Sequence, residues 1–312
     1  MPKKIGFLMD PLESIKPYKD TTFAFMLSAQ QRGHAIFYFT AADMWLQDAV
    51  VYANAHQVKV TDSQDNYFEI INSTVMPLID FDLVLMRKDP PFNMDYIYST
   101  YLLELAENKG LRVLNKPQSL RDANEKLFAS YFPQVCPPTL VSSNLAKITE
   151  FIAQFDEAII KPLDGMGGSN IYRVNKNSAD LATILNKMTR DGQQFMMTQR
   201  YIPEITQGDK RIILINGEPM GYALARIPAP HDFRGNLAQG ATGVVQKLSA
   251  RDVEICQIVG PTLREKGLYF VGLDVIGDYL TEINVTSPTG AREIERETKL
   301  DIGALFFEGL GL

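Results

Sequence analysis

The first 115 residues alternate short apolar runs with amphipathic segments that carry helix caps, and this order limits the possible folds. The apolar runs are too short for buried helices and indicate strands at residues 4–9, 35–39, 81–86 and 112–115. Asp20 begins one intervening helical segment, which Gly33 ends, and Gly110 ends the segment that begins at Met94. Alternating strands and helices predict a mostly parallel sheet with right-handed crossovers. We therefore expect an open parallel α/β domain over residues 1–122.

The pattern changes after this domain, because strands are then followed directly by strands. Residues 157–162 and 171–174 flank a glycine-rich loop and predict an antiparallel pair. Asn216-Gly217 is a hairpin signal between two further apolar runs. The remaining predicted elements are helices at residues 144–155 and 249–266 and an extra hairpin or insertion at residues 47–61. The fold class is therefore α/β, in the α+β multidomain sense.

Composition excludes several classes of function. The net charge is −6 and the chain has no Lys/Arg-rich run, which argues against a nucleic-acid partner. No apolar run approaches the roughly 18 residues that a membrane span requires, and Asp10 cuts off the apolar start of the chain. Cys136 and Cys256 lack the spacing of a disulfide framework or a metal site, so reduced thiols in a cytoplasmic protein are expected. Three scattered histidines argue against a histidine-rich metal site.

The run FVGLDVIGDYLTEIN, residues 270–284, predicts a hairpin whose polar residues fix its register. A two-residue loop would mix polar and apolar side chains on both faces of the hairpin. A three-residue loop, residues 277–279, separates them onto opposite faces. The opposed pairs are then Leu273 with Ile283, Val275 with Thr281, and Asp274 with Glu282.

In that register Asp274, Glu282 and Asn284 share one face of the hairpin. Two carboxylates in direct opposition destabilise a sheet unless a positive charge lies between them. Oxygen ligands of this kind suit Mg²⁺ far better than zinc. The competing interpretation is a solvated face that carries acidic residues by chance.

The loop of residues 163–170 contains Gly165, Gly167 and Gly168, and it joins two strands. It lacks the following helix and the GK[ST] ending of a P-loop. Glycines still let successive backbone N–H groups turn toward one anion, and Lys161 adds a fixed positive charge just before them. The loop is therefore a candidate phosphate site, although taken alone a glycine-rich hairpin is ordinary turn chemistry.

A long glycine-rich segment, residues 229–243, has little apolar periodicity and no capped helix. Structureless segments of this length inside a compact region are commonly lids or disordered loops. We interpret it as a mobile flap that carries Arg234 and Asn236. An inert surface excursion is the alternative.

Together these motifs resemble the ATP-grasp superfamily, and most closely the prokaryotic glutathione synthetases. The resemblance spans nearly the whole chain, and its last motif is long and highly specific. The motifs that carry it are MRKDPPF (86–92), NKPQSLRDANEKL (115–127), KPLDGMGG (161–168), GDKRI (208–212), RGNLAQG (234–240) and GLDVIGDYLTEINVTSPTGAREIE (272–295).

The resemblance implies a nucleotide site between two β-rich ATP-grasp subdomains. These would be a small lid subdomain, residues 123–200, and a catalytic subdomain, residues 201–312, whose flap covers residues 228–243. The first domain would bind substrate. The implied ATP-binding residues are Lys126 on a predicted helix, Lys161, Gly165, Gly167, Gly168, the adenine hinge Gln199, Arg200 and Tyr201, and Asp209 as the ribose partner.

The resemblance also implies the residues that hold metal and peptide. Mg²⁺, with Mn²⁺ as a substitute, would bridge the ATP phosphates to Asp274, Glu282 and Asn284. The arginines Arg211 and Arg226 would face the transferred phosphoryl group, and Arg234 would close over it. Arg87, at the end of a strand of the first domain, and Ser287 and Thr289 would hold the peptide substrate.

The implied activity is an ATP-dependent ligase that joins γ-glutamylcysteine to glycine and releases ADP and phosphate. A carboxylate is a poor acyl donor, so such ligases first transfer the γ-phosphoryl group of ATP to it. Two alternatives stay open: another ATP-grasp carboxylate–amine ligase, and an ATP-binding regulatory module without turnover. Its partners would be small molecules, with no nucleic acid and no membrane. The resemblance further implies a homo-oligomer, a tetramer in members of this family.

Overall fold

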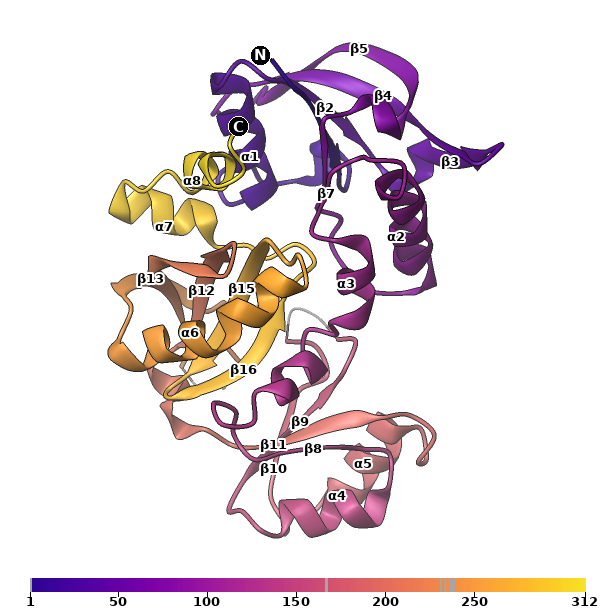
Figure 1. Ribbon diagram of the computed structural model, residues 1–312. Helices are drawn as coiled ribbons and strands as arrows, with labels where there is room; N and C mark the ends of the chain where they lie inside the picture. The colour runs from indigo at the N-terminus through magenta and orange to yellow at the C-terminus, as the bar shows by residue number, and fades with distance from the viewer. Residues whose placement is uncertain (1, 166–167, 231, 233, 236–239) are drawn as a thin grey trace.

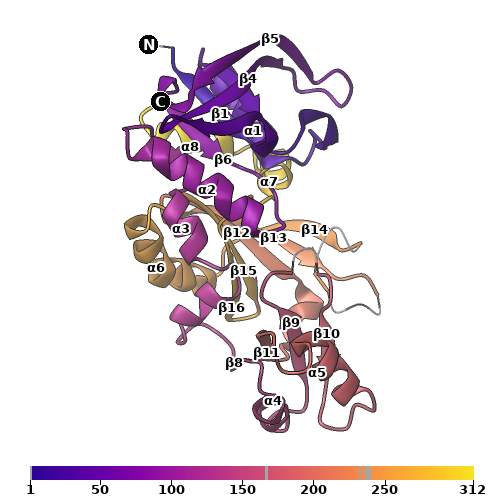
Figure 2. The same cartoon turned by 90° about the vertical axis from the view of Figure 1, so that its right-hand side faces the viewer.

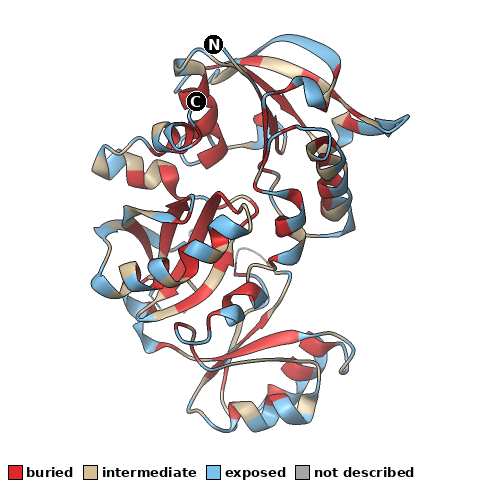
Figure 3. Ribbon diagram, in the orientation of Figure 1, coloured by how far each residue is buried: buried red, intermediate tan, exposed pale blue. Residues whose placement is uncertain are grey.

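The structure is a computed structural model that describes residues 2–165, 168–230, 232, 234–235 and 240–312. Three β-sheets follow one another along the described chain, and the third lies between the other two in space (Figures 1 and 2). Buried residues concentrate in these sheets and on the helix faces that cover them (Figure 3). None of the described helices is long and apolar enough to cross a membrane.

The first sheet begins as predicted, with a parallel core. Its parallel strands, in spatial order, are β2 (Ala35–Phe39), β1 (Lys4–Leu8), β6 (Leu83–Met86) and β7 (Val113–Leu114). Asp20 caps α1 (Thr21–Gln31) by accepting a hydrogen bond from Phe23 N at 2.7 Å. Helix α2 (Met94–Glu107) is capped in the same way by Asn93. The predicted helices and the glycines that end them are therefore confirmed.

The sheet is not mostly parallel, because the segment predicted as an insertion joins it. Strand β4 (Val50–Val60) pairs antiparallel with β2, with β3 (Met44–Gln47) and with β5 (Phe68–Pro77). The prediction of a hairpin at residues 47–61 is confirmed in part, since β4 forms hairpins on both sides. The prediction of a mostly parallel sheet is wrong, because β4 extends the sheet from β2 by antiparallel pairing and adds two more strands to it.

The second sheet is antiparallel and carries two helices. Its strands are β8 (Thr139–Ser142), β9 (Ala158–Pro162), β10 (Tyr172–Val174) and β11 (Met196–Arg200), in the order β10-β9-β11-β8. Helices α4 (Leu145–Ile152) and α5 (Leu181–Thr189) pack on it around a separate apolar core. The predicted antiparallel pair around the glycine loop is present, with Tyr172 opposite Ile160.

The third sheet is also antiparallel. Its strands are β12 (Asp209–Ile215), β13 (Glu218–Ile227), β14 (Thr242–Lys247), β15 (Phe270–Ile276) and β16 (Tyr279–Asn284), in the order β14-β13-β12-β15-β16. Asn216 and Gly217 both adopt positive φ in the β12–β13 turn, as the hairpin signal predicts. Helix α6 (Ala250–Glu265) lies within the predicted range of residues 249–266, is capped by Ser249 and packs on β13.

The β15–β16 hairpin has the predicted pairing at its functional end and a different turn. Asp274 lies opposite Glu282, as predicted. Val275, however, lies opposite Leu280 rather than Thr281, and the loop has two residues, not three. Thr281 is the extra residue on β16 and forms a β-bulge. The Thr281 hydroxyl donates to Asp274 O at 3.0 Å. The bulge restores the separation of polar and apolar faces that a regular two-residue hairpin would lose.

The segment around Lys126 is not the helix that was predicted. Helix α3 (Pro117–Asp122) ends before it, and a short 3-10 helix, η4 (Leu127–Tyr131), begins directly after it. Lys126 therefore lies in the turn between them. Backbone hydrogen bonds of 2.8 Å run from Ile283 N to Glu125 O and from Leu280 N to Val135 O, so this segment packs on β16 of the third sheet.

The last two helices return the chain to the first sheet. Helix α7 (Ala291–Thr298) leads into α8 (Ile302–Glu308), which lies beside α1 in both views (Figures 1 and 2). The rings of Phe25 and Phe306 stack with centroids 4.3 Å apart. The other short 3-10 helices are η1 (Leu12–Ser14), η2 (Ala41–Asp43), η3 (Leu78–Asp80) and η5 (Pro203–Gln207).

Candidate active site

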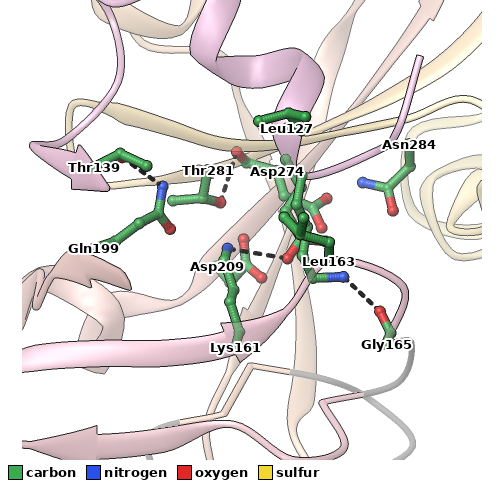
Figure 4. Close-up of polar contacts among 12 residues, drawn as sticks. Leu127, Thr139, Lys161, Leu163, Gly165, Gln199, Asp209, Asp274, Thr281 and Asn284 are labelled. Carbon is green, nitrogen blue, oxygen red and sulfur yellow. Dashed lines mark hydrogen bonds and ion pairs between the residues drawn. The ribbon is translucent and has the colours of Figure 1, made fainter. Parts of the chain in front are cut away.

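A cavity of about 730 Å³ is lined by residues that belong to all three sheets and their connections. The second sheet contributes Lys161 and Gln199, and the third sheet contributes the face of β12, β13, β15 and β16 that is turned away from α6. The loops of the first domain close the remaining end. Most of the predicted ATP, metal and phosphoryl-transfer residues line this one cavity, and Figure 4 shows several of them converging.

Two arginines and two aspartates form a buried network on the third sheet. Arg211 lies opposite Asp274 across the β12–β15 pair, and its Nε donates to Asp274 Oδ1 at 2.7 Å. Arg226, on β13, pairs with Asp274 Oδ2 at 3.0 Å and with Asp209 Oδ2 at 2.6 Å. The network follows from the strand register, because residues 209, 211, 226 and 274 occupy neighbouring positions on one face.

The network gives its two carboxylates opposite titration behaviour. Burial opposes ionisation of Asp274, but the Arg211 and Arg226 cations outweigh it and hold the pKa of Asp274 well below its usual range. Burial raises the pKa of Asp209 to about 7, and the nearby charges of Asp274 and Glu282 add to the rise against the lowering effect of Arg226. Asp209 Oδ1 is buried and has no hydrogen-bond partner among the described residues.

Two lysines face this network from the other side of the cavity. Lys161 Nζ lies 3.2 Å from Glu282 Oε1, and this pair joins the second sheet to the third. Lys126 Nζ donates to the backbone oxygen of Gly165 and so reaches the glycine loop from the η4 side. Burial opposes ionisation of Glu282, yet Lys126 and Lys161 lower its pKa overall.

The predicted metal-binding residues fit a hard divalent cation. Glu282 uses only Oε1 for Lys161, and its other carboxylate oxygen has no partner among the described residues. Asn284 donates through Nδ2 to Gly272 O at 3.2 Å, which leaves its Oδ1 as an acceptor. Asp274 Oδ1 accepts one hydrogen bond and retains a second lone pair. Two carboxylates and one amide oxygen lining one cavity match the oxygen-rich ligand sets of Mg²⁺.

The predicted adenine hinge lies at the second-sheet end of the cavity. Gln199, Arg200 and Tyr201 all line the cavity. Two of their backbone N–H groups are already used, because Arg200 N donates to Pro138 O and Tyr201 N donates to Glu157 O. Gln199 Nε2 donates to Thr139 Oγ1 at 3.0 Å (Figure 4). An adenine ring at this hinge would therefore need partners other than these two N–H groups.

Parts of the predicted phosphate loop and flap lie outside the described residues. Gly165 and Gly168 line the cavity, and Gly168 has a φ of +78°. Gly167 and the flap residue Asn236 are not described. Arg234 lines the cavity and pairs with Asp232 at 2.8 Å.

The predicted peptide-binding residues are not all brought together. Ser287 and Thr289 line the cavity, and Thr289 O accepts from Arg211 Nη1 at 3.1 Å. Arg87 does not line it: its side chain is buried, donates to Thr22 Oγ1 and Pro288 O at 3.1 Å, and lies near the rings of Phe25 and Phe270. Burial lowers the pKa of Arg87 to about 10.

Several cavity residues carried no functional signal in the sequence. Glu125 is partly buried, its Oε1 accepts from Val285 N, Thr286 N and Thr286 Oγ1, and removal from water raises its pKa. Asp20 and Asp89 also line the cavity. Asp20 was identified only as a helix cap, and nothing in the spacing of Glu125 or Asp89 distinguishes them from surface acids. Their side chains become neighbours only through the packing of the first domain on the third sheet.

Comparison with known proteins decides the family. Residues 3–121 match the model of the prokaryotic glutathione synthetase N-terminal domain, and residues 125–299 match that of the prokaryotic glutathione synthetase ATP-grasp domain. The chain is 53% identical over 303 residues to glutathione synthetase from Coxiella burnetii, covering 97% of this chain and 94% of that protein. The chain belongs to the prokaryotic glutathione synthetase family. It is also 50% identical over 310 residues to glutathione synthetase from Pseudomonas putida, covering 99% and 98% of the two chains.

Solved structures place this glutathione synthetase family member in the ATP-grasp fold. The ATP-grasp ligase PsnB, complexed with a minimal precursor, superposes with a TM-score of 0.65 at 16% identity and covers 99% of this chain and 98% of its own. The D-cycloserine synthetase DcsG superposes with a TM-score of 0.68 at 13% identity and covers 98% of both chains. The predicted fold and family are therefore confirmed, and the chain is an enzyme of the ATP-dependent ligase class.

Proposed function

We propose that this chain joins γ-glutamylcysteine to glycine through an acyl-phosphate intermediate, converting ATP to ADP and phosphate. The observation that carries the proposal is the single cavity in which Lys126, Lys161 and the hinge lie opposite the Arg211–Asp274–Arg226 network. Phosphoryl transfer requires in-line positioning and neutralisation of charge rather than a protein nucleophile. A set of lysines and arginines around one chamber supplies that neutralisation.

ATP would lie with its base at the hinge and its phosphates between the two lysines. Lys161 is only 6% exposed, so its charge acts in a site of low polarisability and is little screened. Asp209 Oδ1 is an acceptor with no partner among the described residues, and a ribose hydroxyl would satisfy it. Gly165 and Gly168, with Gly167 between them, would bring the backbone close to the phosphates.

Asp274, Glu282 and Asn284 would hold Mg²⁺, for which Mn²⁺ would be an acceptable substitute because it shares oxygen ligation. The ion would neutralise phosphate charge when it is bound. Within the protein, Lys161 keeps Glu282 ionised and positioned, and the two arginines do the same for Asp274.

Arg211 and Arg226 would act on the transferred group. Their guanidinium groups are buried and fixed by Asp274 and Asp209, so they need little reorganisation when negative charge develops. Arg226 would also stabilise the oxyanion that forms when the amine of glycine attacks the acyl carbon. Arg234 would close over this site and help to exclude water, which competes with glycine for the acyl phosphate. Ser287 and Thr289 would bind the peptide, whereas Arg87 would support it from beneath through Pro288 O.

Substitution of Glu282 by Gln tests this assignment. The variant keeps the size of the side chain and removes one anionic metal ligand, so ADP release with ATP, γ-glutamylcysteine, glycine and Mg²⁺ should fall by about 100-fold or more. Thermal unfolding should change little, because Gln still accepts a hydrogen bond from Lys161. Chelation of the metal by EDTA should stop wild-type turnover in the same assay.

Glu265→Gln is the matched control, since Glu265 is exposed at the end of α6 and makes no side-chain hydrogen bond among the described residues. It should retain wild-type turnover. If Glu282→Gln retained most of its activity, Glu282 would not be a metal ligand.

The same assay separates the remaining ligase alternative. Turnover that requires other amino acids in place of glycine would favour a different carboxylate–amine ligase. Nucleotide binding without any turnover would favour a regulatory module, although the intact arginine network speaks against it.

We also propose a cytoplasmic homotetramer. Cys136 and Cys256 are both free, which suits a reducing compartment. The edge strand β5 exposes Ile70, Ile71 and Val75, which would suit burial against another copy. Sedimentation equilibrium would measure the assembly directly.

A further inference from the structure

The end of the cavity that the first domain builds has no role in the assignments above. Lys16, Lys19 and Asp20 line it from the segment that leads into α1, and Asp89 lines it from the loop after β6. Two cations and two anions therefore face one small volume.

The two aspartates are held in fixed positions by the fold. Asp20 is the cap of α1 and accepts from Phe23 N at 2.7 Å. Asp89 N donates to Asp10 Oδ2 at 2.9 Å, and the Asp89 carboxylate accepts from the side chain of Ser287. Burial raises the pKa of both carboxyl groups. The charge of Asp89 raises the pKa of Asp20 further, and the charge of Asp10 raises the pKa of Asp89. Neither residue needs ordering before it binds a ligand.

Arg87 is a buried cation near both aspartates, and its charge lowers the pKa of each. The hydroxyl of Tyr96 lies in the same surroundings, close enough to Arg87, Asp89 and Glu125 for their charges to influence it. It is fully buried and has no hydrogen-bond partner among the described residues. Among the described residues, neither Asp20 nor Asp89 forms a salt bridge, since the neighbouring Lys88 pairs with Asp10, so an ammonium group could pair with both carboxylates.

The two lysines at this end form no ion pair within the part of the chain that the structure describes. Among the described residues, no carboxylate lies within salt-bridge distance of Lys16 or Lys19, and neither ammonium group makes a side-chain hydrogen bond. This end of the cavity thus offers anionic and cationic groups side by side, which is the complement of a zwitterionic amino-acid head group.

The position along the cavity matches one end of the peptide substrate. The carboxylate to be activated must lie beside Arg211, and Ser287 and Thr289 come next along the cavity wall. Because Ser287 contacts Asp89, the wall runs without interruption from the peptide-binding turn to the charged end. The γ-glutamyl α-ammonium and α-carboxylate groups are the part of the substrate opposite its cysteine carboxylate.

We propose that Asp20 and Asp89 bind the α-ammonium group of the γ-glutamyl residue, and that Lys16 and Lys19 bind its α-carboxylate. The inference rests on the proposed function, because it assumes that γ-glutamylcysteine occupies this cavity. It makes Asp20 and Asp89 determinants of specificity for a γ-linked glutamyl residue over other acyl groups.

The test compares Asp20→Asn with wild type on three compounds that would accept the phosphoryl group of ATP, called acceptors here. They are γ-glutamylcysteine, glutarylcysteine, which lacks the α-ammonium group, and 4-aminobutanoylcysteine, which lacks the α-carboxylate. Asn caps a helix as well as Asp does, so α1 should be retained while the charge is lost. The variant should raise KM by about tenfold or more for the two acceptors that carry an ammonium group. KM for glutarylcysteine should stay unchanged, and kcat should change little for any of the three.

Asp301→Asn is the matched control. Asp301 caps α8 by accepting from Ala304 N at 2.7 Å, the same distance as the Asp20 bond, and it does not line the cavity. It should leave KM for all three acceptors at the wild-type value. Asp89→Asn provides a second variant, with the same expected pattern as Asp20→Asn.

The outcomes separate this inference from the proposed function. If wild type released no ADP with any of the three acceptors and glycine, the proposed function would fail. If wild type turned over γ-glutamylcysteine while both variants raised KM for glutarylcysteine equally, the aspartates would act only through structure and the inference would be wrong. Unchanged KM for γ-glutamylcysteine in both variants would also overturn it.

Discussion

At the scale of single residues, Asp209 is held between opposing influences. One carboxylate oxygen pairs with Arg226 at 2.6 Å, and the other is buried without a partner among the described residues. Removal from water and the charges of Asp274 and Glu282 together outweigh the arginine, so the pKa of Asp209 rises to about 7. The ligand-free protein therefore carries an acid that changes its protonation near neutral pH.

Asp209→Asn should flatten the pH dependence of stability. The folded-state pKa of about 7 lies above the ordinary value of 3.8, so the folded state binds the extra proton between these values. The stabilisation is complete below about pH 4 and is lost as pH rises toward 7, by up to about 1.4 kcal/mol per pH unit. Urea unfolding of ligand-free wild type and variant at pH 5, 6, 7 and 8 measures the difference. A difference that stayed constant with pH would show that Asp209 titrates normally.

Sequence reasoning located residues of the site where strand alternation fixes their direction, and not where only tertiary packing does. Asp274 and Glu282 were placed opposite each other from the period of two along a strand. Arg87 was expected at a substrate-facing strand end, but its side chain turns inward to Thr22 and Pro288 O. The position of a residue at a strand end can be predicted from the sequence, but the neighbours that its side chain contacts cannot.

At the scale of elements, the prediction of strands and helices succeeded where caps and glycines mark their ends. It failed where two local backbone structures fit the same sequence pattern. The alternation of polar and apolar residues over 270–284 is compatible with a three-residue loop and also with a two-residue loop and a bulge at Thr281. The sequence pattern does not distinguish these two structures. Lys126 lies in a segment that is polar enough for a helix, yet hydrogen bonds to β16 hold it as a turn.

In helix α6, close packing requires a residue that has low helix propensity. A glycine inside a helix costs about 1 kcal/mol relative to alanine. Gly260 is nevertheless required, because a Cβ there would lie 2.3 Å from the backbone oxygen of Gly217 in the β12–β13 turn. The helix and the turn can approach closely only when both positions lack a side chain.

Gly260→Ala should therefore destabilise the protein despite its better helix propensity. The overlap with Gly217 forces the helix or the turn to move, at a net cost of about 2 kcal/mol. Gln257→Ala, an exposed change in the same helix, should stay within about 0.5 kcal/mol of wild type. Thermal unfolding of both variants measures the effect, and a Gly260→Ala protein as stable as wild type would mean that the turn yields freely.

At the scale of the whole molecule, Asn115 connects the first domain to the third sheet. Its Nδ2 donates to Phe270 O at 2.9 Å and to Val285 O at 2.8 Å, and its Oδ1 accepts from Phe270 N at 2.9 Å. All three bonds are buried. One side chain thus satisfies backbone groups on strand β15 and just beyond β16, at the boundary between the two sheets.

Asn115→Ala should lower the free energy of unfolding by about 3 kcal/mol or more, because three buried backbone groups lose their partner. Asn177→Ala is the control, since Asn177 is exposed and its side chain makes no hydrogen bond among the described residues. Urea unfolding, monitored by circular dichroism, compares the unfolding midpoints of the two variants. Equal midpoints for both variants would show that water replaces Asn115 without cost.

The core beside α1 is assembled from both ends of the chain, since Phe25 stacks on Phe306 and meets Phe270 edge to face. During synthesis, α1 would leave the ribosome about 270 residues before α8, the helix that covers it. Its apolar surface would stay uncovered throughout that interval, so nascent chains should depend on a holdase chaperone until α8 has been synthesised.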